Sequence, residues 1–377
     1  MKLIYLTPNS YPSRTADDFY TKEMARGFNS VAEDNFLLVV AMNESTELDG
    51  IRFASPQLRF RRSQHLFLFY ARYFWWIIFN LLTKKNLKDV VFFVGDPNLS
   101  LILFFFKKIF RFKYRICTDW HLFYNSWKYN YLVKESDCLI TTSERLKNNL
   151  IKQLGAQPAK INAVYGGVDL EKFNALSSIS KIELRTKLNL SSDDILVSYV
   201  GFFKTMGMEK GIDTMIKSLP FIGEKKVKML LVGGKEEQIE EYAELAQTLG
   251  VLDRVIFVGV VPNEIIPTYE KASDILVIPY PDKPHFKEYG FPMKLYEYMA
   301  AKKSIIYSKL EIIDEVLSDC AYSFSPDDPK DLAHVVMDII RNENDAALKA
   351  QAAFEKTTSY TWTKKANNIL QLLQKGS

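Results

Sequence analysis

The sequence is poor in the residues that mark secreted, metal-binding or disulfide-linked proteins. Its 377 residues include only three cysteines, Cys117, Cys138 and Cys320, an odd number without the paired spacing of a metal site. We therefore expect reduced thiols and an intracellular compartment. No pair of aspartates has the spacing of a metal-ligand set, so no bound metal and no cofactor is expected. No cleavable signal segment is visible in the opening residues MKLIYLTPNS.

Charge is unevenly divided along the chain. Residues 1–165 carry 23 Lys and Arg against 14 Asp and Glu, and the remaining residues carry 26 against 31. A basic first half can face an anionic lipid surface or a nucleic acid, but an acidic second half argues against a protein that coats nucleic acid. We therefore expect no nucleic-acid partner. The length and the hydrophobic content of 47% fit two globular domains.

Short apolar runs alternate with helical segments in both halves, which predicts an α/β fold with two doubly wound parallel sheets. Gly166 to Asp169 reads as a boundary between a first domain, 1–168, and a second, 169–357. Residues 170–192 are expected to be helical, and the tail from Tyr360 to Leu373 is expected to form an amphipathic helix within 358–377 that packs back on the first domain. The runs expected to form strands are 2–6, 36–40, 90–94, 114–117, 137–143, 195–201, 228–234, 254–259, 274–279 and 304–308.

The most apolar run of the protein is HLFLFYARYFWWIIFNLL at 65–82. Its length approaches that of a spanning helix, but Arg72 and Asn80 interrupt it. Three interpretations stay open: a spanning helix, a fully buried core helix and a helix docked on a bilayer surface. The third is favoured by flanking basic residues and by a second aromatic and basic patch at 104–113. The flanking residues are Arg59, Arg61, Arg62, Lys84, Lys85 and Lys88.

Two polar residues follow an expected strand in the first half. Asp119 and His121 come after the apolar run at 114–117, and ligands of open α/β sheets bind at the carboxyl ends of strands. The chain has only four histidines, and a lone histidine is more often structural than catalytic. The strand-end position and the adjoining carboxylate make His121 and Asp119 candidate catalytic residues.

The segment HFKEYGFPMKLYEYMAAKK at 285–303 lies between two buried-strand runs. It predicts a loop containing Gly290 and then a helix that Pro292 can open. Free N–H groups and the positive end of such a helix attract anions. Lys294 and Glu297 share one helix face, where a cation could meet phosphate and a carboxylate could accept from ribose hydroxyls. An ordinary ion pair is the alternative, and the apolar neighbours favour a buried pair over a surface one.

A second loop of this kind follows the run at 195–201. It contains Lys204 and Lys210 before a helix that is expected to begin near Ile212. Both lysines could neutralise a diphosphate, whereas a solvated loop is the alternative interpretation. The loop has neither the spacing of a P-loop nor that of a dinucleotide fingerprint.

The order of these motifs resembles the retaining glycosyltransferases of family four, which have the GT-B fold of two Rossmann-like domains and an interdomain cleft. The resemblance covers essentially the whole chain. Its matching segments are VYGGVDLEKF (164–173), YVGFFKTMGMEKGIDTMIKSL (199–219), LLVGG (230–234), RVIFVGVV (254–261), ASDILVIPY (272–280) and GFPMKLYEYMAAKK (290–303).

The resemblance implies roles for the matching positions. Lys210 would bind the nucleotide diphosphate, and Glu297 matches the second glutamate of the Glu-x7-Glu signature that holds the ribose. Backbone N–H groups of Phe291 and Met293 would meet the phosphates or the donor sugar. Lys294 resembles the lysine of a subgroup with the pattern Pro-x-Lys-Leu-x-Glu-Tyr-Met. The strand-end histidine of the family falls at or beside Asp119 to His121.

The chain departs from the family pattern at three places. Tyr289 stands eight residues before Glu297, where the first signature glutamate is expected, and Glu288 is one place away. Where the family usually has Gly-Arg after the first strand of the second domain, this chain has Gly201-Phe202, so Lys204 is expected to supply the positive charge of the missing arginine. The Gly-Gly loop that the family has near its amino terminus is replaced by Thr15-Ala16 in this chain.

Together these features predict an enzyme that transfers a sugar from a nucleoside-diphosphate donor to a glycan or lipid-linked acceptor, with retention and without a metal. Cell-surface polysaccharide or glycolipid synthesis at the cytoplasmic face of a membrane is the expected setting. Two alternatives remain. The first is a sugar-nucleotide 2-epimerase of the same fold, which needs several acid and base groups in the cleft and is poorly matched by four scattered histidines. The second is a catalytically silent scaffold or carbohydrate-binding protein, which the departures at Phe202 and Tyr289 would support.

Overall fold

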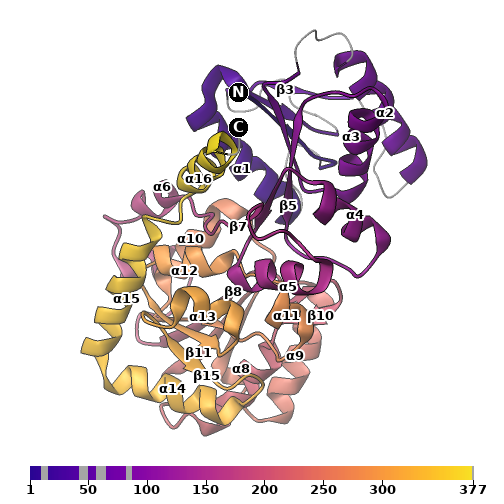
Figure 1. Cartoon of the computed structure of the whole chain (residues 1–377). Coiled ribbons are helices and arrows are strands. Elements are labelled where there is room, and N and C mark those ends of the chain that lie inside the picture. The colour runs from indigo at the N-terminus through magenta and orange to yellow at the C-terminus, as the bar shows by residue number, and fades with distance from the viewer. Residues whose placement is uncertain (10–15, 42–49, 57–64, 82–86, 376–377) are drawn as a thin grey trace. The chain divides into compact units, whose positions relative to one another are not determined.

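The computed structural model describes residues 1–9, 16–41, 50–56, 65–81 and 87–375 (Figure 1). These residues form two compact units. The first consists of Met1–Gly167 together with Trp362–Ser377, and the second of Val168–Thr361. The boundary expected from the sequence followed residue 168.

The described residues of the first unit form a seven-stranded parallel sheet in the order β3-β2-β1-β4-β5-β6-β7. Apart from Lys2, the residues of the central strands β1 and β4 are all buried, which is why these strands appear as apolar runs in the sequence. The strands are β1 (Lys2–Leu6), β2 (Phe36–Val39), β3 (Phe53–Ala54), β4 (Val90–Val94), β5 (Arg115–Trp120), β6 (Cys138–Thr141) and β7 (Ile161–Ala163).

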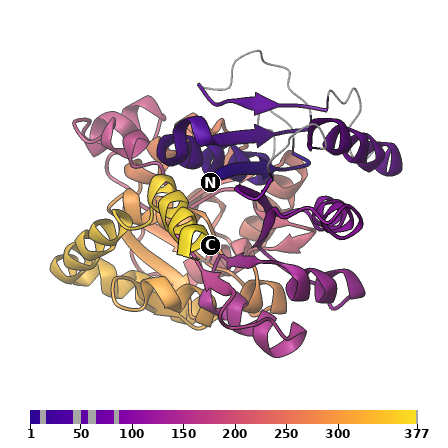
Figure 2. The same cartoon turned by 45° about the horizontal axis from the view of Figure 1, so that its top comes forward.

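Helices cover this sheet, and the final helix of the chain is one of them. Helix α16 lies against α1 although the two are more than 300 positions apart in the sequence, and Figure 2 shows the two side by side. The Arg115 guanidinium donates to the Leu373 carbonyl at 2.6 Å, which fixes the end of α16 to β5. The helices are α1 (Ala16–Ala32), α2 (Leu66–Leu81), α3 (Pro97–Ile109), α4 (Trp127–Glu135), α5 (Glu144–Leu154) and α16 (Trp362–Lys375), with a 3-10 turn, η1 (Glu33–Asn35), after α1.

The second unit contains a six-stranded parallel sheet in the order β12-β11-β8-β13-β14-β15. The order turns at β8 and β13, the pair beside which the site of an open α/β sheet forms. The strands are β8 (Ile195–Val200), β11 (Val227–Gly234), β12 (Val255–Gly259), β13 (Ile275–Ile278), β14 (Ser304–Ser308) and β15 (Tyr322–Phe324), and β9 (Lys204–Thr205) with β10 (Met208–Glu209) forms an antiparallel hairpin after β8.

The helices of the second unit lie between these strands in the chain. Helix α10 contacts α7, β8 and α12, a set that matters for the site described below. The helices are α6 (Leu170–Asn174), α7 (Lys181–Lys187), α8 (Ile212–Ser218), α9 (Glu236–Thr248), α10 (Ile266–Ala272), α11 (Pro284–Glu288), α12 (Lys294–Ala300), α13 (Glu311–Leu317), α14 (Pro329–Arg341) and α15 (Glu343–Thr357).

The predicted α/β class with two parallel sheets is confirmed, and several local predictions are corrected. Residues 170–192 form two short helices, because Ser180 starts a new capping box with Glu183 in the middle of the segment. The helix expected to open at Pro292 begins at Lys294 instead. The loop expected before Gly290 contains the short helix α11, whose first turn accommodates Pro284.

Candidate active site

Two clusters of predicted site residues occur, one in each unit. In the first unit Asp119 lies near the end of β5 and is buried, with 6% of its surface exposed. Its Oδ2 accepts from the Tyr20 hydroxyl at 2.8 Å and contacts His121 Nε2 at 3.1 Å, while its Oδ1 has no hydrogen-bond partner among the residues that the structure describes. Asp119 therefore orients the His121 ring, and the half-exposed ring can reach a ligand.

Helix α16 adds a buried cation to this first-unit cluster. Lys365 is 2% exposed, and its ammonium lies 5.4 Å from the centre of the Tyr20 ring. Burial on its own would raise the pKa of Asp119, but His121, Lys365 and the Tyr20 hydroxyl outweigh it, so the pKa is lowered and the carboxylate stays ionised. Trp362 packs its ring edge-on against Tyr20 at 5.4 Å. The C-terminal helix thus completes the surroundings of Asp119.

In the second unit Lys294 lies at the carboxyl end of β8. Its ammonium donates to the Val200 carbonyl at 2.9 Å and lies 3.4 Å from the centre of the Tyr199 ring. Burial, followed by the nearby charge of Lys210, lowers the pKa of Lys294 well below its usual value. Gly201 leaves room for this side chain: its φ is +132°, and a Cβ there would lie 2.7 Å from Lys294 Nζ. The end of β8, Gly201 and Lys294 thus form one cluster.

Lys210 lies just before α8 and belongs to the same cluster, since its charge acts on Lys294. Burial lowers the pKa of Lys210 to about 8. Lys210 in turn lowers the pKa values of Lys294 and, after burial, of His285. A group that shifts two others in this way lies close to both, so the structure brings two lysines and a histidine together. Two ammonium groups in a partly dry site repel each other, and an anion between them would relieve that repulsion.

The signature carboxylate belongs to the same cluster. Glu297 lies on α12 one turn after Lys294; both side chains are half-buried, whereas Leu295, Tyr298 and Met299 are buried. Glu297 raises the pKa of Lys294, against the larger effect of burial. The expectation of a buried pair on an apolar helix is therefore only partly met, since this face stays accessible to a ligand.

Other predicted contacts occupy the loop before α12. Glu288 ends α11, and the Tyr289 and Gly290 N–H groups both donate to the His285 carbonyl, at 3.1 and 2.7 Å. Phe291 stacks on Tyr296 with ring centres 5.6 Å apart, and its N–H donates to the Tyr289 carbonyl. Met293 precedes α12 as its N-cap. The roles predicted for Glu288, Tyr289, Phe291 and Met293 stay predictions.

Lys204 has a different environment from Lys210. Its ammonium pairs with Glu209 at 2.5 Å and with Glu241 at 3.0 Å, and these bonds raise its pKa. Two carboxylates already neutralise this lysine in the structure. Its predicted contact with the diphosphate would require those ion pairs to open.

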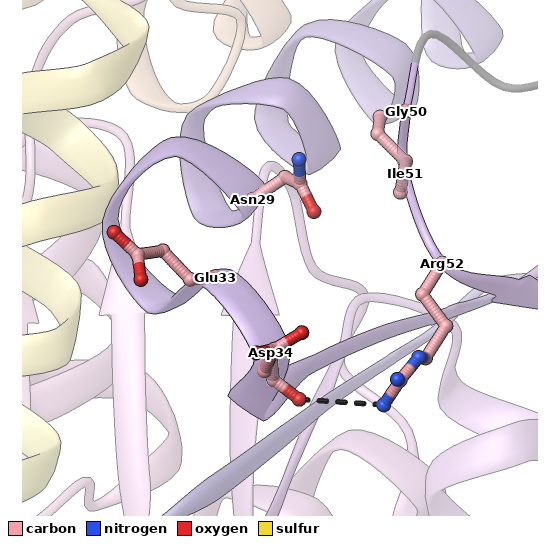
Figure 3. Close-up of a pocket in the computed structure, with 6 residues that line it drawn as sticks. All are labelled: Asn29, Glu33, Asp34, Gly50, Ile51 and Arg52. Atoms are coloured by element: carbon pink, nitrogen blue, oxygen red, sulfur yellow. Dashed lines mark hydrogen bonds between the residues drawn. The ribbon is translucent and has the colours of Figure 1, made fainter.

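A hollow elsewhere in the first unit has no residue in common with the predicted site. This cavity of about 560 Å³ lies beside the end of α1. Figure 3 shows the residues that line it, among which the Arg52 guanidinium donates to the Asp34 carbonyl at 3.4 Å. Its lining residues are Asn29, Glu33, Asp34, Gly50, Ile51 and Arg52. In the described part of the chain, no three His, Cys, Asp or Glu side chains gather as metal ligands would.

Sequence reasoning missed Glu270, Lys365, Tyr20 and His285. Lys365 could have been found, because it falls on the apolar face of the final helix, three residues after Trp362 and four before Ile369. Glu270 gave no such signal, because four of the seven residues of its short helix are buried and none is exposed, so no single apolar face marks its position.

Parts of the chain are similar in sequence to known proteins. Residues 195–342 match the family described as glycosyl transferases group 1. An uncharacterized glycosyltransferase of Methanocaldococcus jannaschii is 28% identical over 48% of this chain and 45% of its own length. A D-inositol 3-phosphate glycosyltransferase of Xylanimonas cellulosilytica is 27% identical over 39% of this chain and 36% of its own. The chain thus spans less than half of the length of these curated relatives.

Solved structures share the fold of the whole chain. Anabaena HepE in complex with UDP has a TM-score of 0.77 at 17% identity, with all of both chains covered. Sucrose-phosphate synthase from Thermosynechococcus elongatus has a TM-score of 0.75 at 18% identity, covering 100% of this chain and 99% of the other. At such identities the likeness establishes the fold, which is that of GT-B glycosyltransferases.

Proposed function

We propose that this chain is a glycosyltransferase that takes a sugar from a nucleoside-diphosphate donor and transfers it to a glycan or lipid-linked acceptor, with retention of the anomeric configuration. The carrying observation is that the Lys294 ammonium donates to the Val200 carbonyl at the carboxyl end of β8, and that Lys210 and Glu297 lie near enough to Lys294 for their charges to act on its pKa. The family match over residues 195–342 includes all three. HepE, a structural neighbour, is described in complex with UDP and with UDP-glucose.

Each charged group has a task in this proposal. Lys210 and Lys294 neutralise the diphosphate as it leaves, which is where negative charge develops, and so do the work that a divalent ion does in other transferases. Glu297 accepts from the ribose hydroxyls. In the first unit Asp119 holds His121 in position to contact a hydroxyl of the sugar or the acceptor. Lys204, Gly201 and Gly290 border the donor.

A transfer assay tests the proposal. The unmodified protein is supplied with UDP-, GDP-, ADP- and dTDP-sugars and candidate lipid-linked acceptors in the presence of EDTA, and the product is analysed by NMR. We expect a glycoside with the donor's anomeric configuration. Diphosphate release without an acceptor would instead favour the 2-epimerase, and an inverted product would refute retention.

Nucleotide affinity should depend on pH through Lys210. The pKa of Lys210 in the empty protein is about 8, and a bound diphosphate raises it by attraction. Binding is therefore strongest below pH 8 and is expected to weaken about tenfold per pH unit above it, because the unbound protein then lacks the proton that binding requires. Isothermal titration with a nucleoside diphosphate between pH 7 and 9 measures this. In Lys210→Met the dependence should flatten, and an equally flat curve in the unmodified protein would contradict the assignment.

We also propose peripheral binding to an anionic membrane through a surface that we call the aromatic face. In the described part of the chain, no helix is both long and apolar enough to cross a bilayer. Helix α2 buries Phe69, Tyr73 and Ile77 on one side, so it is not a fully buried core helix either: its other side is exposed. The aromatic face consists of the exposed residues Phe67, Trp75 and Phe79 of α2, Phe105 and Ile109 of α3, and Phe110 directly after α3.

Neighbouring contacts and charges support this membrane proposal. Phe74 of α2 packs on Phe106 of α3 with ring centres 4.8 Å apart and on the exposed Phe105 at 5.8 Å, so the two helices contact each other beside these aromatic residues. Arg111 and Lys113, just beyond α3, are exposed, and each basic residue near an anionic surface contributes about 1 kcal/mol. Arg59, Arg61, Arg62, Lys84 and Lys85 lie outside the described residues.

Vesicle flotation tests the aromatic face. With vesicles of phosphatidylcholine and phosphatidylserine, the unmodified protein should float, and Phe67→Ser/Trp75→Ser/Phe79→Ser should lower its partition at least about tenfold, because three exposed apolar groups are lost. Leu348→Ser, an exposed leucine of the second unit, is the matched control. An unmodified protein that stays wholly in the soluble fraction would end this part of the proposal.

A further inference from the structure

Two of the three cysteines of the chain lie side by side in the sheet of the first unit. Cys117 of β5 and Cys138, the first residue of β6, are partners in the register of this parallel pair, and both thiols are free. Partners in register project from the same face of a sheet, because side chains alternate between its faces along each strand. Neighbouring strands lie about 4.8 Å apart, which is within the range of about 4.4–6.8 Å between the Cα atoms of a disulfide. The backbone therefore holds the two thiols at a spacing from which a disulfide can form.

The two thiols differ in their access to solvent. Cys117 is buried, with 0% of its surface exposed, whereas Cys138 is half-buried. The register of β6 with its other neighbour, β7, begins only at Leu139, so the backbone at Cys138 is paired with β5 and can move towards it. A dissolved oxidant therefore reaches Cys138 first, and Cys117 is the neighbour that can respond.

The surroundings of Cys138 favour its thiolate. The Cys117 thiol, as a hydrogen-bond partner, lowers the pKa of Cys138, and the Arg115 guanidinium lowers it further against the opposing effect of burial. Arg115 precedes Cys117 by two residues in β5 and so shares its face of the sheet. The nearby Asp137 carboxylate pairs with the Lys107 ammonium at 2.6 Å, which moderates its repulsion of a thiolate. Reactive cysteines lie in such partly exposed, electropositive surroundings.

The third cysteine has none of these properties. Cys320, in the second unit, is 2% exposed, and its thiol donates to the Val316 carbonyl at 3.8 Å. Burial raises the pKa of Cys320 to about 11. A buried thiol of this kind stays protonated and unreactive near neutral pH, so Cys320 is an internal control.

We propose that Cys138 and Cys117 form a reversible oxidation site, at which hydrogen peroxide oxidises Cys138 and Cys117 then closes a disulfide between β5 and β6. In the first step the Cys138 sulfur attacks a peroxide oxygen. An S–O bond forms, the O–O bond breaks, and the departing hydroxide takes up a proton to become water. In the second step the Cys117 sulfur loses its proton and attacks the Cys138 sulfur, so that an S–S bond forms and the oxygen leaves as a second water.

The balance of this reaction needs no other reactant. Two thiols and one hydrogen peroxide give one disulfide and two waters, so the two sulfurs are oxidised and the peroxide is reduced. The disulfide lies two residues before Asp119 on the same face of β5, and the oxidation site therefore adjoins the cluster of Asp119 and His121. The inference does not depend on the proposed function, because it requires neither a donor nor an acceptor.

Peptide mapping identifies the link, because trypsin places the three cysteines in three different peptides. The reduced full-length protein is treated with hydrogen peroxide at neutral pH, blocked with N-ethylmaleimide and digested without reductant. Cys117→Ala, Cys138→Ala and the control Cys320→Ala are treated in the same way, and the melting temperature of each reduced variant shows that it is folded. The peptides are 116–128 with Cys117, 135–145 with Cys138 and 310–330 with Cys320.

We expect peptides 116–128 and 135–145 to be linked in the unmodified protein and in Cys320→Ala, within a chain that migrates as a monomer, and dithiothreitol should remove the link. In Cys117→Ala, dimedone should trap a sulfenic acid at Cys138, because the second thiol is missing. In Cys138→Ala, oxidation of Cys117 should be at least about tenfold slower than that of Cys138 in Cys117→Ala, because Cys117 is buried.

The map of the unmodified protein decides the matter even if a variant fails to fold. No link in that protein, a link that includes 310–330, or a link between two chains would overturn the inference. Oxidation of Cys117 in folded Cys138→Ala at the rate of Cys138 in Cys117→Ala would overturn the assigned order of the two steps.

Discussion

Replacing Lys210 with methionine is expected to weaken nucleoside-diphosphate binding about 10- to 100-fold and to lower kcat/KM about 10²- to 10³-fold. Methionine keeps most of the apolar length of the side chain and removes the ammonium. The charge is lost from a site where burial has already stripped water from it, so solvent cannot replace it. The remaining lysine, Lys294, would then face the diphosphate alone.

Lys210→Met should weaken nucleotide binding without destabilising the folded protein. Burial holds the pKa of Lys210 at about 8, which means that the folded state disfavours the charged lysine, so Lys210→Met should not lower the melting temperature. Lys217→Met is the matched control, because Lys217 is an exposed lysine of α8 that pairs only weakly with Asp213 across one helical turn. Steady-state kinetics and titration measure both variants. Equal losses in the two would refute a specific role for Lys210.

Substituting Gly211 with alanine should destabilise the second unit by about 2–5 kcal/mol. Gly211 precedes α8 with φ +80°, a conformation that costs other residues about 1–2 kcal/mol. A Cβ at this position would lie 1.7 Å from the Pro279 carbonyl oxygen, so the backbone after β13 must move, and such overpacking adds about 1–3 kcal/mol. Because Lys210 is the preceding residue, the shift should also weaken nucleotide binding.

Gly250→Ala separates the cost of the backbone conformation from the cost of the steric contact. Gly250 has φ +67°, and a Cβ there would meet no atom within 4 Å, so only the cost of the backbone conformation applies. Differential scanning calorimetry should show a drop of at least about 5 °C for Gly211→Ala and about half of that or less for Gly250→Ala. Equal drops would mean that the contact with Pro279 does not constrain the loop.

The strands that could be predicted from the sequence are those buried on both faces. Lys2–Leu6, Val90–Val94 and Ser304–Ser308 form strands with the predicted bounds, because burial on both faces demands continuous apolar residues. Phe53–Ala54 and Tyr322–Phe324 were missed, since strands of two or three mostly half-buried residues at a sheet edge leave no recognisable pattern.

The candidate site was only partly predictable for a related reason. Lys210, Lys294 and Glu297 belong to local motifs with a strand before and a helix after, so their sequence context indicates their chemistry. Glu270 acquires its surroundings from α12, some 24 residues further along the chain, and Lys365 reaches Asp119 only because α16 returns to the first unit. Such neighbours depend on tertiary packing, which spacing in the sequence does not encode.

The central claim is that the second unit binds a nucleoside-diphosphate sugar at Lys210, Lys294 and Glu297. A thermal-shift screen of the unmodified protein against UDP-, GDP-, ADP- and dTDP-sugars tests it most directly, with the Lys210→Met variant alongside. A donor present at 100 times its dissociation constant stabilises the folded protein by about 2.7 kcal/mol. At least one donor should therefore raise the melting temperature of the unmodified protein clearly and have much less effect on Lys210→Met. No shift with any donor, or an equal shift in the variant, would contradict the account.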